Sequence, residues 1–161
     1  LNQLEGDYTV IGIDAYRPPY IPWHLTTIEF FQEVNEHLAE NGVMVINVGR
    51  TNTDRSLVDA LTNTLSFVYP SIHAIDVPHS LNTILVATRE VTASENLFAN
   101  LDALPDDAHP MLRQVLTDAR ENIVTINRSD VVFTDDRAPV ETITDSLVLN
   151  FILGGGMEEL R

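Results

Sequence analysis

The chain has 161 residues, enough for one domain with its own hydrophobic core. It contains no cysteine, which excludes disulfides and thiolate chemistry. Its net charge is −15 and its nine basic residues are all arginine, which argues against nucleic-acid binding and is compatible with a cationic substrate or simply with high solubility. No run of about 18 apolar residues occurs and the first residues lack the pattern of a signal peptide, so we expect a cytoplasmic chain.

The first predicted element is a strand that ends on an acid. Residues 8–13 form an apolar run that predicts a buried parallel strand, too apolar for an exposed edge. Asp14 follows at its carboxyl end, where ligands bind in open α/β sheets, and a proline-stiffened aromatic loop comes next. We therefore expect Asp14 to be a catalytic or substrate-binding acid.

Helices and strands alternate after this loop. The Thr26-x-x-Glu29 pattern predicts a capping box that opens a helix, and Asn41-Gly42 predicts the end of that helix. Residues 43–48 predict a second buried strand, and Asp54 is expected to cap the helix that follows it. This order indicates parallel strands joined by helical crossovers.

The second half of the chain begins with two strands and continues with helices. Residues 72–77 and 81–88 predict strands whose connection is too short for a parallel crossover, so we expect an antiparallel pair. Helices are predicted over 94–104, over 110–120 and from Pro139, with extended pieces at 123–126 and 131–133. The order is that of half of a mostly parallel α/β sheet, and it lacks the Gly-rich turn that opens a nucleotide-binding domain.

Two further segments receive a structural interpretation. Asp135-Asp136-Arg137 precedes the last predicted helix, where acids favour a helix N-terminus. Residues 154–161 begin with three glycines and are expected to form a flexible tail. The five histidines have no metal-ligand spacing, so no metal site is predicted.

Six segments, in their order and spacing, resemble the spermidine synthases. They are residues 14–22, 24–31, 43–50, 76–78, 82–89 and 134–141. The similarity is strongest to the bacterial spermidine-synthase-like proteins, some of which are fused to a membrane domain that would tether the full-length protein. It implies a Rossmann-like methyltransferase fold of seven strands with a closing antiparallel hairpin, of which this chain supplies strands four to seven and C-terminal helices. Residues 1–153 would then be the C-terminal half of the catalytic domain.

The resemblance also implies a reaction. Spermidine synthases transfer an aminopropyl group from decarboxylated S-adenosylmethionine to putrescine by in-line displacement, and Asp14 matches their catalytic aspartate. An acid there would deprotonate the attacking ammonium, because only the neutral amine is nucleophilic. Tyr16, Arg17 and Tyr20 would line the substrate site on a gating loop. Arg17 stands where the family usually has a second aspartate, which disfavours putrescine and favours a neutral or anionic substrate.

Expectations about cofactor and partners follow from the missing strands. The strands that bind S-adenosylmethionine or its decarboxylated form would precede Leu1, so we expect this chain to bind no cofactor alone and to be inactive alone. Its expected partners are the missing N-terminal half or a second copy in a homodimer, together with a small amine substrate. The alternative is a non-catalytic interaction or oligomerisation module, whose unpaired strand at residues 8–13 accepts a partner strand. A flavodoxin-like or receiver-like domain fits poorly with the closing antiparallel hairpin.

Overall fold

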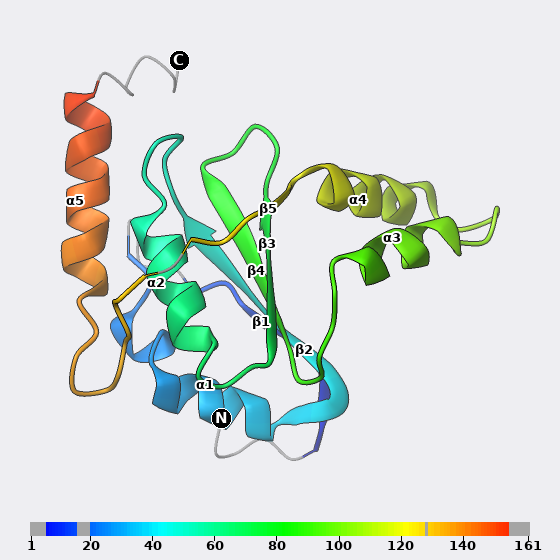
Figure 1. Ribbon diagram of the computed structural model, residues 1–161, viewed down its shortest axis with the longest axis horizontal. Coiled ribbons are helices and arrows are strands. Elements are labelled where there is room, and N and C mark those ends of the chain that lie inside the picture. The colour runs from blue at the N-terminus through cyan, green and yellow to red at the C-terminus, as the bar shows by residue number, and fades with distance from the viewer. Residues whose placement is uncertain (1–5, 16–19, 128, 155–161) are drawn as a thin grey trace.

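The computed structural model describes residues 6–15, 20–127 and 129–154, which form one mixed sheet with helices around it (Figure 1). Tyr16 and Arg17, predicted to bind substrate, lie outside these residues, as does most of the predicted tail. Along the chain the elements are β1 Tyr8–Ile13, a 3-10 turn at Trp23–Leu25, α1 Ile28–Glu36, β2 Leu38–Gly49, α2 Ser56–Leu65, β3 Ser71–Asp76, β4 Asn82–Thr88, α3 Glu95–Asp102, α4 Pro110–Glu121, β5 Ile123–Val124 and α5 Val140–Leu153.

The sheet has the strand order β1-β2-β4-β3-β5. β1 and β2 are parallel, with α1 in the crossover between them, whereas β4 runs antiparallel to both of its neighbours, β2 and β3. The predicted α/β class and the antiparallel pairing of the third and fourth strands are therefore confirmed. Since β4 lies between β2 and β3 and runs antiparallel to both, the carboxyl ends of β2 and β3 lie beside the amino end of β4.

The core lies between one face of the sheet and the helices α1 and α2. Met44, Ile46 and Val48 alternate along β2 and are fully buried, and Phe31 of α1 and Leu61 of α2 cover them from the helical side. The intervening strand residues on the opposite face are only half-buried. The hydrophobic effect therefore holds α1 and α2 on one face only.

The N-terminal strand lies at the edge of the sheet. Among the described strands β1 pairs only with β2, and the side chain of Val10 is 60% exposed. The prediction of a buried inner strand at residues 8–13 was therefore wrong for this chain, because no described strand covers the second side of β1. The edge position that the alternative interpretation needs for this strand is present in the described sheet.

The first helix ends earlier than its apolar spacing predicted. α1 ends at Glu36, and β2 begins at Leu38. The predicted stop, Asn41-Gly42, lies instead inside β2, where the register between β1 and β2 shifts. A Cβ on Gly42 would lie 2.9 Å from the carbonyl oxygens of Ala39 and Tyr8. Glycine is therefore required here by the close approach of backbone within an irregular strand.

The cap of α1 lies one residue later than the predicted capping box. The Thr27 hydroxyl accepts a hydrogen bond from the Phe30 amide at 3.3 Å and donates one to Asp135 Oδ1 at 2.7 Å. Glu29 Oε2 accepts a hydrogen bond from the Asp135 amide at 3.1 Å. Asp135 thus ties the segment before α5 to the start of α1, in line with its structural interpretation.

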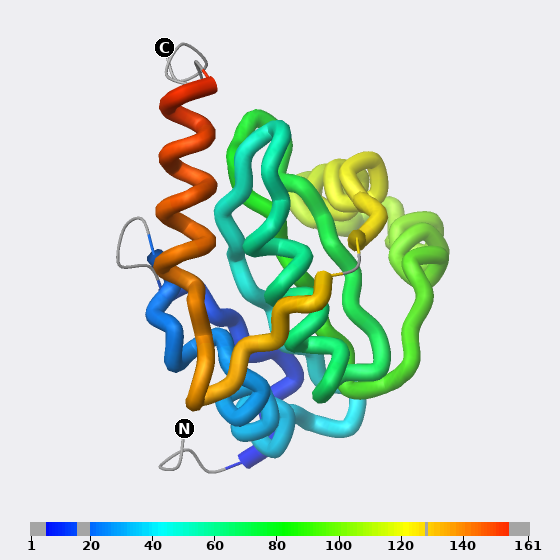
Figure 2. Tube along the Cα trace, turned by 60° about the vertical axis from the view of Figure 1, so that its left-hand side comes forward, coloured from blue at the N-terminus to red at the C-terminus, as the bar shows by residue number. Residues whose placement is uncertain are grey.

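The remaining helices lie at two opposite sides of the molecule. α5 stands alongside α2, and α3 and α4 pack on each other at the far side (Figure 2). Gly154 forms the C-cap of α5. Within residues 6–15, 20–127 and 129–154, no helix has both the length and the apolar character needed to cross a bilayer.

Candidate functional site

Asp14 lies directly after β1, at the carboxyl end predicted for a functional acid. Its side chain is exposed, and Oδ1 accepts a hydrogen bond from Asn47 Nδ2 of β2 at 3.2 Å. Because β1 and β2 are parallel, the carboxyl ends of both strands bring these two polar groups together. The arrangement presents an oriented carboxylate to solvent, where it could accept a proton or bind a cation.

Tyr20, the other predicted substrate residue that the structure describes, is joined to α5. Its hydroxyl donates a hydrogen bond to Asp145 Oδ1 at 2.6 Å. This hydrogen bond raises the pKa of Tyr20, and partial burial and the negative charges of Asp145 and Glu141 raise it further. The contact connects the end of the loop after Asp14 to α5 across 125 residues of sequence.

A cluster of charged side chains at the carboxyl ends of β2 and β3 was not predicted. Arg55 donates to both carboxylate oxygens of Asp76, at 2.9 and 3.0 Å, and Arg50 contacts the same carboxylate at 3.2 Å. The Thr83 hydroxyl also donates to Asp76, at 2.6 Å. Burial alone would raise the pKa of Asp76, but hydrogen bonds from Arg55 and Thr83 and the two positive charges hold it below its ordinary value.

The position of Asp76 could have marked it as a candidate site residue, although not its arginine partners. Like Asp14, it is an acid at the end of an apolar strand, and two arginines follow the preceding strand in the chain. Two guanidinium groups on one carboxylate leave the cluster with one surplus positive charge. In a chain of net charge −15, this is a local reversal of sign.

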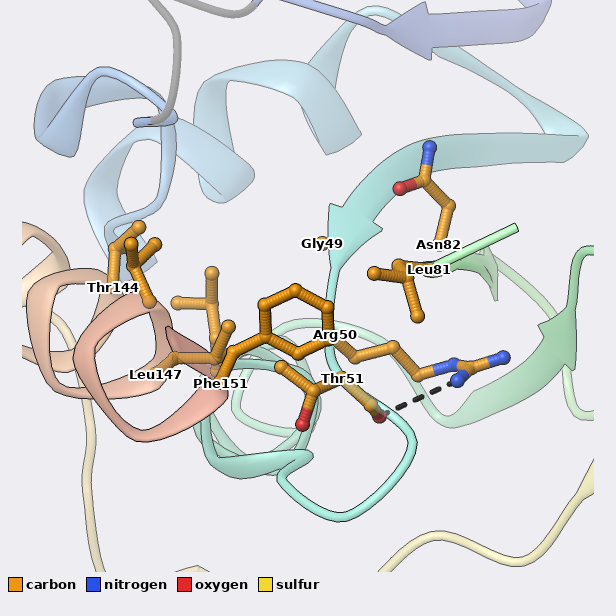
Figure 3. A pocket seen from close by; sticks show the side chains of 10 residues that line it. Gly49, Arg50, Thr51, Leu81, Asn82, Thr144, Leu147 and Phe151 are labelled. Carbon is orange, nitrogen blue, oxygen red and sulfur yellow. Dashed lines mark hydrogen bonds between the residues drawn. The ribbon is translucent and has the colours of Figure 1, made fainter. Parts of the chain in front are cut away.

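A cavity of about 340 Å³ opens between the end of β2, the start of β4 and α5 (Figure 3). Leu147 and Phe151 approach it from α5, and Gly49 lies at the end of β2. It is lined by Gly49, Arg50, Thr51, Leu57, Leu81, Asn82, Thr144, Leu147, Val148 and Phe151. A wider, more polar hollow of about 780 Å³ shares Arg50 and Leu81 with this cavity and is also lined by residues 77–80 of the loop after β3.

Metal-ligating side chains do not gather in the described part of the chain. Within it, no group of three or more histidine, aspartate or glutamate residues is arranged to hold a metal ion. Among the groups at the carboxyl ends of β1 and β2 that could meet a cofactor are the Asp14 carboxylate and the polar side chain of Asn47.

Comparison with known proteins finds a distant similarity for the chain. No protein-family model matches the chain. It is 29% identical over 151 residues to a probable polyamine aminopropyl transferase of Bifidobacterium longum, and the match covers 84% of the chain and 34% of that protein. The chain is a distant homologue of the polyamine aminopropyltransferases. It spans about a third of the length of this relative.

Solved structures resemble the fold. A probable spermidine synthase from Corynebacterium glutamicum matches with a TM-score of 0.51 and 22% identity, over 78% of this chain and 49% of that one. Human methyltransferase-like protein 13 in complex with SAH gives a TM-score of 0.49 and 19% identity, over 80% of this chain and 55% of that one. The match to the bacterial structure shows that the sheet and its helices have a Rossmann-like methyltransferase fold.

Proposed function

We propose that this chain is the C-terminal part of a spermidine-synthase-like transferase in which Asp14 is the general base. The observation that carries the proposal is the exposed Asp14 carboxylate at the carboxyl end of β1, oriented by Asn47, in a distant homologue of aminopropyltransferases. The order β1-β2-β4-β3 supports reading these strands as the fourth, fifth, seventh and sixth of the full sheet. The first three strands, with the nucleoside site, would then lie upstream.

The proposed reaction is an in-line displacement at carbon. Asp14 accepts a proton from the ammonium of the acceptor, which frees the nitrogen lone pair. The nitrogen attacks the carbon next to the sulfonium of S-adenosylmethionine or its decarboxylated form, and the carbon–sulfur bond breaks as the carbon–nitrogen bond forms. The sulfur keeps the bonding electron pair and leaves as a neutral thioether. The hydrogen bond from Asn47 to Asp14 would fix the direction in which the carboxylate meets the amine.

The first test is donor binding by titration calorimetry. We expect no heat when the 161-residue chain is titrated with S-adenosylmethionine, its decarboxylated form or the thioether product. A protein extended upstream to the length of its relatives should bind at least one of them. Absence of binding by the extended protein would reject the proposed function, and turnover by the 161-residue chain would reject its dependence on an upstream half.

The second test is the base itself. In the extended protein, Asp14→Asn should lower kcat by about 10²- to 10⁴-fold while donor affinity stays unchanged, because a general base contributes about that factor. Asp7→Asn is the matched control, since Asp7 is an exposed acid just before the opposite end of β1. An equal loss in both variants would contradict the role of Asp14.

One observation favours a second function. β1 is the outermost strand of the described sheet, and an edge strand of this kind accepts strands from other polypeptides. We propose as the alternative that this edge joins two copies in a non-catalytic module. Sedimentation velocity would then show a dimer that Val10→Pro abolishes, because proline adds no strand donor and distorts the edge. A monomer at all concentrations would reject this alternative.

A further inference from the structure

The cavity beside α5 has the chemistry of an apolar binding site. Its volume of about 340 Å³ lies at the lower end of the range for small-molecule sites. Most of its wall is aliphatic or aromatic, and no carboxylate stands among its lining side chains in the described structure. We propose that this cavity binds an uncharged, apolar part of the acceptor, so that the acceptor is an amine with one apolar end and not a polyamine. Its role toward an acceptor rests on the proposed function, whereas binding of an apolar group does not.

Electrostatics disfavour a second ammonium group in the cavity. Arg50 contributes to the wall, and its guanidinium points away from Leu147 and Phe151 (Figure 3) toward Asp76. Arg55 binds the same carboxylate, so the cluster behind the wall carries one surplus positive charge. An ammonium in this cavity would lose its hydration without gaining an anion and would face this charge. A linear polyamine with a cation at each end is therefore a poor fit.

A single ammonium has a separate place at the same edge. Asn47 binds Asp14, and Gly49, two residues further along β2, lines the cavity. At the rise of a β-strand these two residues are roughly 7 Å apart. The Asn47 side chain lies on the face opposite α1 and α2, whereas Leu57 of α2 lines the cavity. The alkyl or aryl group of an amine bound at Asp14 would therefore reach Leu147 and Phe151 over the end of β2 at Gly49. The separation of one acid from one apolar cavity is what selects a monoamine.

The test uses primary amines that differ in one feature at a time. The 161-residue chain, labelled with ¹³C in its leucine and valine methyl groups, is titrated with n-butylamine, n-hexylamine and 1,6-diaminohexane. Affinity should rise about fourfold per added methylene, the fold-change that corresponds to about 0.8 kcal/mol per buried CH₂. Hexylamine should bind at least tenfold more tightly than the diamine of equal length. The shifted methyl signals should belong to Leu57, Leu81, Leu147 and Val148.

Two tryptophan substitutions on α5 provide a matched pair. Phe151→Trp should fill the cavity and weaken hexylamine binding at least tenfold. Leu149→Trp should leave binding unchanged, because Leu149 is 55% exposed and lies outside the cavity wall. Thermal unfolding of both proteins verifies that they fold. Val148→Asp is an independent second variant, since a carboxylate in the wall should reverse the preference in favour of the diamine.

The outcomes separate this inference from the proposed function. Equal or tighter binding of the diamine, or the absence of shifts at the lining methyl groups, would overturn the inference even if the extended protein binds its donor. Failure of donor binding in the extended protein, with hexylamine binding retained, would reject the proposed transferase and leave the cavity as an apolar ligand site.

Discussion

At the scale of single residues, two acids at strand ends have opposite surroundings. Asp14 is exposed and accepts a hydrogen bond from one neutral amide, whereas Asp76 is clamped by two guanidinium groups and the Thr83 hydroxyl. A carboxylate held by two cations has no capacity left for a substrate cation. A place at the end of a strand therefore gives one acid suited to proton transfer, Asp14, and one acid that joins three strands, Asp76.

The Asp76 cluster should make stability depend on pH. Its pKa in the folded protein lies below the ordinary 3.8, so the unfolded chain takes up the proton first. The contribution of Asp76 is then fully present above about pH 5 and is lost as the pH falls below 3.8 through the folded-state value. We expect Asp76→Asn to lower the free energy of unfolding by about 2 kcal/mol at pH 7 and by much less near pH 2.5.

Urea denaturation of wild type and variant across this pH range measures the difference. Asp107→Asn is the control, because Asp107 is an exposed acid in the connection between α3 and α4. The free energy of unfolding of Asp107→Asn should change with pH in parallel with that of the wild type. If the gap between Asp76→Asn and the wild type stayed constant from pH 7 to pH 2.5, the ion pairs would not be the source of the stabilisation.

At the scale of elements, the start of α1 anchors the segment that leads to α5. Thr27 caps α1 and also binds Asp135, so Thr27→Ala removes two hydrogen bonds at once. We expect a loss of about 1–2 kcal/mol in the free energy of unfolding, with most of it restored by Thr27→Ser. Thr53→Ala, at an exposed loop position, should cost much less. Urea unfolding that ranks the two alanine variants equally would contradict the capping role.

Local patterns predicted the elements well where only one structure suited the pattern. The bounds of the strand at residues 8–13, although not its place in the sheet, and the antiparallel hairpin were predicted correctly, because apolar runs and a short connection leave few alternatives. The end of α1 could not be predicted in this way, since Leu38 is buried at helical spacing and equally as the first residue of β2. A long-range contact determines where α1 ends. The Tyr8 amide donates a hydrogen bond to the His37 carbonyl at 2.8 Å, and this pairing with β1 begins β2 at Leu38.

The candidate site was predictable only in part, for a related reason. The position of Asp14 follows from one strand and its end, which the sequence displays directly. The Arg50–Asp76 contact requires that β4 lie between β2 and β3 in the sheet. This strand order does not follow from the order of the strands along the chain. The cavity requires α5 to return across the end of β2, so its lining residues lie up to about a hundred positions apart.

At the scale of the whole molecule, two parts of the described sheet lack a covering element: the outer side of β1, and the β1 and β2 part of the face opposite α1 and α2. α3 lies against the β3 and β4 part of that face. The face opposite α1 and α2 carries Val43 and Val45 of β2 and Ile84 and Val86 of β4, all half-buried. Strands in a parallel arrangement are normally covered on both faces. On the proposed function, upstream sequence would cover this face in the full-length protein.

A substitution at Gly12 tests whether upstream residues pack on this face of the sheet. A Cβ on Gly12, on the open face of β1, would meet nothing within 4 Å. In the 161-residue chain, Gly12→Val should therefore leave the free energy of unfolding unchanged or raise it by up to about 1 kcal/mol, because glycine weakens a strand. In the extended protein the same substitution should cost about 1–3 kcal/mol, because the added methyl groups would crowd the covering segment.

Gly42→Val supplies the matched control, since its Cβ would collide with backbone carbonyls of this chain. It should destabilise both proteins, and urea denaturation of the four variants and two parents measures the contrast. A cost of Gly12→Val confined to the extended protein would show that upstream residues pack on β1. Tolerance of Gly12→Val in both proteins would mean that the upstream part leaves this face open, and an open face would favour the edge-pairing module over the transferase.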